Sequence, residues 1–256
     1  MAVLKKLLKY DFRSNLKIFL FIWPGIILLA LSSVIFRLLP SGNHVTQGLE
    51  VSMTVAYCLG LVGACILALV VSILRFYKGL LRDEGYLMFT LPVTTGRLIL
   101  SKFIVALVTV PVTCLLSIGG MWLVFFNLER TSMLSYLILQ FRSMSGEDWL
   151  TLALSVLVVF AGLASKLAQV YFSCSIGHLA KKHRVLLSVV CYYGISVALE
   201  TVSVMFFSTL NSVTELVIFR MSMLQLLLVM VLILSALAAV YLVLTRTVLS
   251  RRLNLE

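Results

Sequence analysis

Two ionisable residues interrupt long apolar stretches of this 256-residue chain, and they are the first candidates for chemistry. Lys166 lies within residues 149–176, and Glu200 lies within residues 185–207. An ionisable group at membrane depth often marks a substrate or ion pathway. At 1.5 Å per residue each lies about 24–25 Å along its stretch, so either side chain can also reach the nearby membrane surface. We treat Lys166 and Glu200 as possible pathway residues, at opposite ends of their stretches.

Common catalytic, nucleotide-binding and metal-binding motifs are absent from the sequence. There is no P-loop, no H-E-x-x-H and no G-x-S-x-G. The three histidines have no acidic residue close in sequence, and the five cysteines lie in or beside apolar stretches without a C-x-x-C pair. We therefore predict that the chain is not an enzyme and holds no metal or cofactor.

The composition requires a membrane environment. Hydrophobic residues make up 61% of the chain and charged residues 12%, whereas a soluble domain is about half apolar and a quarter charged. A helix needs about 20 apolar residues to cross a bilayer. Six stretches of that length occur, at residues 18–36, 51–74, 103–128, 149–176, 185–207 and 221–245. We expect an all-α integral membrane protein with six transmembrane helices in a single domain over residues 1–256.

Charge distribution predicts the orientation in the membrane. If the N-terminus is cytoplasmic, 16 of the 21 Lys and Arg residues lie in inside segments and four lie in outside segments. Positive residues are enriched in cytoplasmic loops, so we expect both termini in the cytoplasm. The same rule explains the net charge of +11, and nucleic acid is not an expected partner.

Residues 1–17 have the pattern of an amphipathic helix at the membrane surface. Apolar residues recur at helical spacing on one face, and Lys5, Lys9, Arg13 and Lys17 recur every four residues on another. The alternative is a secretory signal peptide with a weak cleavage site near residues 30–32. The long basic region and Asp11 favour the interfacial helix.

The inside segment between the second and third stretches is unusually apolar for a connector. A short amphipathic helix fits residues 82–89, Pro92 ends it, and Thr94 or Thr95 caps the next helix. Exposed leucine and aromatic side chains beside charged residues need a cover, either the membrane surface or a partner protein.

This segment also resembles a known family. The runs Asp83-Glu84-Gly85-Tyr86-Leu87, Thr90-Leu91-Pro92-Val93-Thr94 and Ser101-Lys102 are similar to permease subunits of bacterial ABC-2-type ABC transporters, especially those of Gram-positive bacteria. Residues 171–177 with the basic residues 181–184 resemble a later cytoplasmic loop of that group. The resemblance extends to the whole plan of an interfacial helix, six spans and cytoplasmic ends.

The resemblance implies an ATP-driven exporter in the bacterial cytoplasmic membrane. Such permeases form homodimers or heterodimers and associate with two separate ATP-binding subunits, which hold the ATP and Mg²⁺. The interfacial N-terminal helix and the first cytoplasmic loop contact those subunits there, and the short helix of the loop acts as a coupling helix. By position, the partner-coupling residues of this chain are Arg82, Asp83, Glu84, Gly85, Tyr86, Leu87, Phe89, Leu91 and Pro92.

Two other functional classes are compatible with six spans. A self-contained secondary transporter or channel would need polar residues that converge near the midplane, or broken helices. A non-transporting membrane protein, such as an immunity or assembly factor, would need neither a coupling helix nor an ATPase. Co-purification with an ATPase separates both from the permease.

Overall fold

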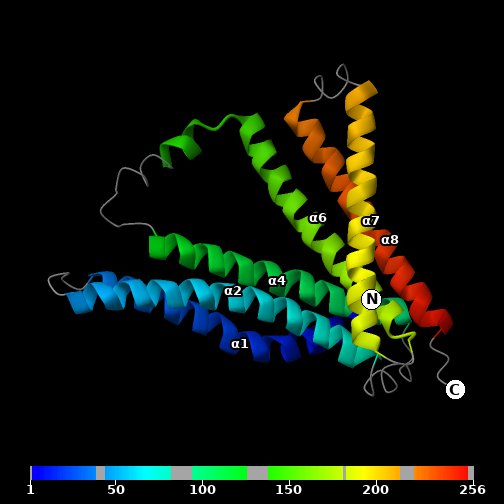
Figure 1. The fold of residues 1–256 in the computed structure, drawn as a ribbon, viewed down its shortest axis with the longest axis horizontal. Helices are drawn as coiled ribbons and strands as arrows, with labels where there is room; N and C mark the ends of the chain where they lie inside the picture. Colours follow the sequence, from blue (N-terminus) through cyan, green and yellow to red (C-terminus); the bar gives the residue numbers. More distant parts are fainter. Residues whose placement is uncertain are drawn as a thin grey trace. The chain divides into compact units, whose positions relative to one another are not determined.

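The computed structural model describes residues 2–38, 44–81, 94–125, 138–180, 183–213 and 222–252, and these form an all-helical protein (Figure 1). The all-α prediction is confirmed for this part of the chain. A short helix over residues 138–143 precedes α6. The long helices are α1 (Ala2–Leu38), α2 (His44–Leu81), α4 (Thr95–Phe125), α6 (Gly146–Gly177), α7 (Arg184–Val213) and α8 (Met223–Arg252).

All six long helices are long and apolar enough to cross a membrane, which makes the chain a multi-pass membrane protein. Each contains one of the predicted apolar stretches, although α4 is described to Phe125 and α8 from Met223. The helices extend past these stretches into their charged flanks. α2, with 38 residues, is about 57 Å long at 1.5 Å per residue, well beyond a hydrocarbon core of about 30 Å.

The N-terminal segment is the beginning of α1 and not a separate helix. α1 runs without a break from Ala2 through the first span to Leu38. One face of this segment is basic and exposed, whereas Asn15 on another face is buried. That the segment lies along the membrane surface stays a prediction. The exposed basic residues are Lys5, Lys6, Lys9, Arg13 and Lys17.

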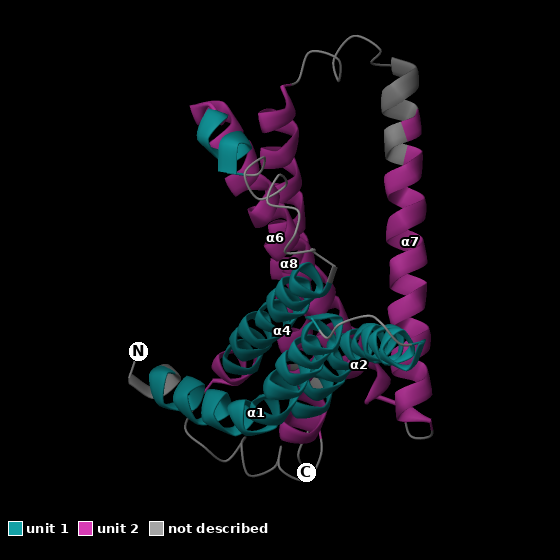
Figure 2. Cartoon of the chain, turned by 90° about the vertical axis from the view of Figure 1, so that its left-hand side faces the viewer, with its two compact units in different colours: residues 1–75, 100–143 teal, residues 76–99, 144–256 magenta. Residues whose placement is uncertain are grey.

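The chain divides into two compact units (Figure 2). Unit 1 comprises Met1–Arg75 and Leu100–Ser143, and unit 2 comprises Phe76–Ile99 and Met144–Glu256. The division falls inside two helices, so that α2 and α4 each contribute to both units. Both ends of the predicted coupling segment therefore belong to unit 2, while the helices that they continue belong mainly to unit 1.

Unit 1 packs α1, α2 and α4 around a small apolar core. Tyr57 of α2 is fully buried there, and its hydroxyl donates a hydrogen bond to the Ser117 carbonyl of α4 at 2.8 Å. Gly120 lets α4 approach, because a Cβ there would lie 2.5 Å from the Tyr57 hydroxyl. Small residues at such crossings are typical of membrane helices, whose association depends on close packing.

Unit 2 is organised around α6, which contacts both α7 and α8. A capping box starts α6: the Ser145 hydroxyl accepts from the Asp148 backbone N–H, and the Asp148 carboxylate accepts from the Ser145 backbone N–H. Much of the second half of α6 is buried, including Leu167, Ala168 and Tyr171. α6 is thus the central helix of unit 2, against which α7 and α8 both pack.

Candidate functional site

The predicted coupling residues Arg82, Asp83, Glu84, Gly85, Tyr86, Leu87, Phe89, Leu91 and Pro92 lie outside the described residues. Their assignment stays a prediction. The structure does describe the two chain segments that flank them, the end of α2 and the start of α4. How these flanks are held determines what a force on the segment can move.

The flank that precedes the segment is anchored on α6. The rings of Phe76 and Tyr171 stack with centroids 4.0 Å apart and planes 9° apart, and both side chains are fully buried. The Tyr77 ring meets His178 edge-on at 6.1 Å. Leu80 is also buried. Stacked buried aromatic rings add to the stabilisation from burial alone, so the last turns of α2 are firmly attached within unit 2.

The flank that follows the segment is held at the start of α4. α4 begins at Thr95, close to the predicted cap, and the Arg97 N–H donates to the Thr94 carbonyl at 2.9 Å. Leu98 and Ile99 are buried. The backbone at Gly96 closely approaches α8, because a Cβ there would lie 3.3 Å from Cδ of Arg246. Both flanks are therefore packed, one on α6 and the other against α8.

The two possible pathway residues both have exposed side chains. Lys166 of α6 follows the buried Ser165 and precedes the buried Leu167, so it points away from the packed face of its helix. Glu200 is exposed on α7. The ion pairs found among the described residues involve neither side chain. The structure does not bring Lys166 and Glu200 together, and their role in a pathway stays a prediction.

A buried polar contact links α6 to α7 within unit 2. The Gln169 side chain donates from Nε2 to the Ser196 hydroxyl at 2.8 Å and to the Tyr192 carbonyl at 3.3 Å. Gln169 is almost fully buried. Such a group in an apolar medium must be satisfied by a neighbouring helix, so this contact specifies how the two helices pair.

Unit 1 contains a buried charged cluster that the sequence analysis missed. Lys102 Nζ of α4 lies 3.4 Å from Asp11 Oδ1 of α1, and the Ser101 hydroxyl donates to Asp11 Oδ2 at 2.8 Å. Each carboxylate oxygen of Asp11 therefore has a donor. The side chains of Lys102 and Asp11 are only 8% and 13% exposed. At that burial, hydrogen bonds that satisfy both charges are needed for the pair to be tolerated.

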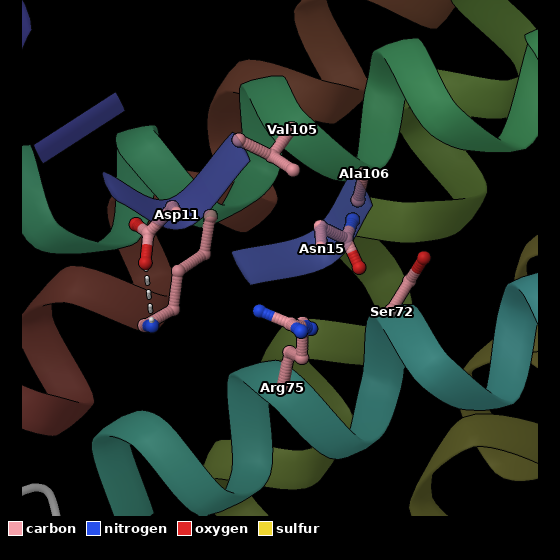
Figure 3. Close-up of a pocket in the computed structure, with 7 residues that line it drawn as sticks. Asp11, Asn15, Ser72, Arg75, Val105 and Ala106 are labelled. Atoms are coloured by element: carbon pink, nitrogen blue, oxygen red, sulfur yellow. Dashed lines mark hydrogen bonds and ion pairs between the residues drawn. The ribbon is translucent and has the colours of Figure 1, made fainter. Parts of the chain in front are cut away.

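The cluster joins all three helices of unit 1 (Figure 3). Arg75 of α2 donates from Nη2 to the Ser14 carbonyl of α1. Asn15 of α1 donates from Nδ2 to the Thr109 hydroxyl of α4 at 3.4 Å. We call Asp11, Asn15, Ser72, Arg75 and Lys102, which line one cavity, the junction cluster. It attaches the N-terminal part of α1 to α2 and α4 by polar contacts.

The residues of the junction cluster are visible in the sequence, but their pattern has a simpler explanation than a buried cluster. Arg75 and Lys102 lie next to the ends of apolar stretches, where the positive-inside rule alone accounts for their charge. Asp11 is the one acidic residue of the basic N-terminal segment, and Asn15 follows it four residues later on the same helix face. An acid and an amide four residues apart on a basic helix fit a partner within the protein as well as the membrane surface, and the burial of Asn15 selects the first.

His178 is expected to make stability depend on pH. It is half-buried at the end of α6, and burial, together with the positive charge of Arg184, lowers its pKa from the usual 6.5. The folded protein therefore binds this proton less well than the unfolded chain does, and stability is lost as pH falls below about 6.5. Thermal unfolding of the wild type and of His178→Gln at pH 7.5 and 5.5 measures the difference.

The variant is expected to lose part of that pH dependence, whereas substitution of the exposed His44 by glutamine should preserve it. An unchanged pH dependence in His178→Gln would contradict the assignment.

Comparison with known proteins adds no family to this description. No family model matches the chain, and neither does any curated protein or solved structure. The case for a function therefore depends on the residues and contacts described above.

Proposed function

We propose that this chain is the membrane-spanning permease subunit of an ATP-driven ABC-2-type exporter, working as a homodimer or heterodimer in the bacterial cytoplasmic membrane. Six spanning helices and the resemblance of residues 83–102 support this proposal. The observation that carries it is the anchoring of both flanks of the coupling segment. Phe76 and Leu98, one on each side of the segment, are buried in unit 2, while α2 and α4 continue into unit 1.

The anchoring supports a mechanical role for residues 82–93. A helix moves as a rigid rod over several turns, and a coupling element must act on parts that have two discrete arrangements. A displacement of this segment would move the ends of α2 and α4 and, through Phe76 and Tyr171, the end of α6. One contact from outside would then act on both compact units.

Within the segment, polar and apolar residues have different proposed roles. Arg82, Asp83 and Glu84 supply charges for contact with an ATP-binding subunit. The side chains of Tyr86, Leu87 and Phe89 supply the apolar surface that such a contact covers. The partner subunit holds the ATP and Mg²⁺, because this chain has no P-loop.

The proposal is tested first by purification. The tagged chain is extracted gently from native membranes, and the co-purifying proteins and the ATPase activity of the eluate are measured. A separate P-loop protein, with hydrolysis lost when its P-loop lysine is substituted, supports the permease. If the chain purifies alone and without ATPase activity, a self-contained transporter or an immunity protein becomes the better description. Glu200 is then the first residue to substitute.

Substitution in the coupling segment is expected to uncouple the two subunits. Glu84→Lys reverses a charge and Tyr86→Ala removes an interface aromatic, a change that costs about 2 kcal/mol or more at a hot spot. We expect at least about tenfold weaker association with the ATPase, with normal insertion of the chain. Pull-down and substrate-stimulated ATP hydrolysis in proteoliposomes are the measurements.

Tyr193→Ala is the control, because Tyr193 is 64% exposed on the spanning helix α7 and lies outside the segment. Full association and hydrolysis in both segment variants would show that the coupling element lies elsewhere.

A further inference from the structure

The junction cluster lines a small pocket within unit 1. Its wall is completed on the α4 side by Val105 and Ala106. The cavity volume is about 10 Å³, which corresponds to the space of one water-sized sphere. This space has room for about one water molecule or one small ion.

One buried acceptor in this cavity lacks a hydrogen bond. Asn15 is 1% exposed, and its Oδ1 has no hydrogen-bond partner among the described residues. The orientation of the amide follows from Thr109, whose hydroxyl donates to the Val105 carbonyl at 3.0 Å and so accepts from Asn15 Nδ2. Oδ1 must then face the cavity, as Figure 3 shows. A buried amide oxygen without a donor is costly, and most such groups in folded proteins are satisfied.

Charge on the cavity wall selects between the occupants that fit. Arg75 and Lys102 contribute two positive charges and Asp11 one negative charge, so a metal cation would meet net repulsion. The Ser72 hydroxyl donates to the Ala68 carbonyl at 2.8 Å, which leaves its oxygen as an acceptor. The net positive charge would attract a small anion, but an anion cannot donate to the acceptors at Asn15 and Ser72. A water molecule can donate to these acceptors and also accept from the cationic groups beside them.

We infer that this cavity is a binding site for one water molecule, which donates to Asn15 Oδ1 and links α1 to α2 and α4. The water completes the hydrogen bonding of the junction cluster. The hydrogen bonds that the water makes between α1 and its neighbours can also break and re-form after a small shift, and they are nearly as strong as direct ones. The N-terminal part of α1 can then move against α2 and α4 while Asn15 Oδ1 keeps a hydrogen-bond donor.

The test uses X-ray radiolytic labelling of the full-length protein in nanodiscs, with water enriched in the heavy oxygen isotope. Hydroxyl radicals formed from a bound water label the side chains beside it. Val105 lines the cavity and is 4% exposed, and Val110 on the same helix is 3% exposed but does not line it. We expect Val105 to be labelled severalfold faster than Val110. Equal labelling of the two valines overturns the inference.

Two variants test what holds the water. Asn15→Leu removes the acceptor, and Ala106→Val fills the cavity from α4 and leaves Asn15 in place. In each variant, labelling of Val105 is expected to fall to the level of Val110. Low labelling of Val110 shows that a variant is still folded. If one of the two variants does not fold, the other still tests the site. If Val105 stays strongly labelled in a folded variant, the proposed site is wrong.

Discussion

Replacing Asp11 with alanine is expected to lower the free energy of unfolding by about 3–5 kcal/mol. Lys102 is buried and pairs with Asp11 at 3.4 Å, so the substitution removes the carboxylate that this ammonium group contacts. It also removes the acceptor of the Ser101 hydroxyl. The loss is large because one partner of a buried pair is removed while the other stays.

Chemical unfolding in mixed micelles measures this effect, and a second ion pair provides the control. Arg37 and Glu50 are 3.1 Å apart but more exposed, at 24% and 32% of their side-chain surface. Glu50→Ala is therefore expected to lower the unfolding free energy by about 1 kcal/mol or less. Exchanging the charges of Asp11 and Lys102 should recover part of the stability that Asp11→Ala loses. If Asp11→Ala and Glu50→Ala have equal effects, the buried pair is not formed.

Gly177→Ala is expected to destabilise unit 2 by about 3 kcal/mol. A Cβ at Gly177 would lie 1.9 Å from the Ser188 hydroxyl, 2.6 Å from the Ser188 backbone nitrogen and 2.8 Å from the Arg184 carbonyl. Two of these atoms belong to the backbone of α7 and have no rotamer in which to avoid the methyl group. The end of α6 and the start of α7 would have to separate, and their contacts would be lost.

The control for this prediction lies on the same helix. A Cβ at Gly162 of α6 would meet nothing within 4 Å. Gly162→Ala should therefore be neutral or stabilise by up to about 1 kcal/mol, because alanine is the better helix former. Thermal unfolding of both variants in one detergent gives the comparison. Similar midpoints for the two would mean that α6 and α7 do not approach as closely as described.

The spanning helices could be predicted because lipid imposes a simple rule. No water is present in the hydrocarbon core, so a spanning segment must satisfy its own backbone, and an α-helix of apolar residues does so. The helix ends were harder to predict. α1 runs from Ala2 through Lys17 into the first span, since backbone hydrogen bonding continues wherever the flanking residues tolerate a helix.

The coupling residues around Glu84 and Tyr86 and the cytoplasmic position of both termini rest on residue patterns and remain predictions. Lys166 and Glu200 were singled out because they interrupt apolar stretches, and the structure leaves both exposed and apart. The sequence did not identify Asp11 and Asn15 as members of a buried cluster, because an acidic residue in a basic helix has several explanations until its partner is known.

The number, type and position of the spanning helices follow from the sequence, because hydropathy along the chain is a local property. The tertiary structure decided which polar groups meet. Asp11 pairs with Lys102, 91 residues away, and Gln169 finds Ser196 on the next helix. Such pairing depends on which helix faces come together. In a membrane that choice is made by close packing and by the need to satisfy every buried polar group, and neither can be derived from hydropathy alone.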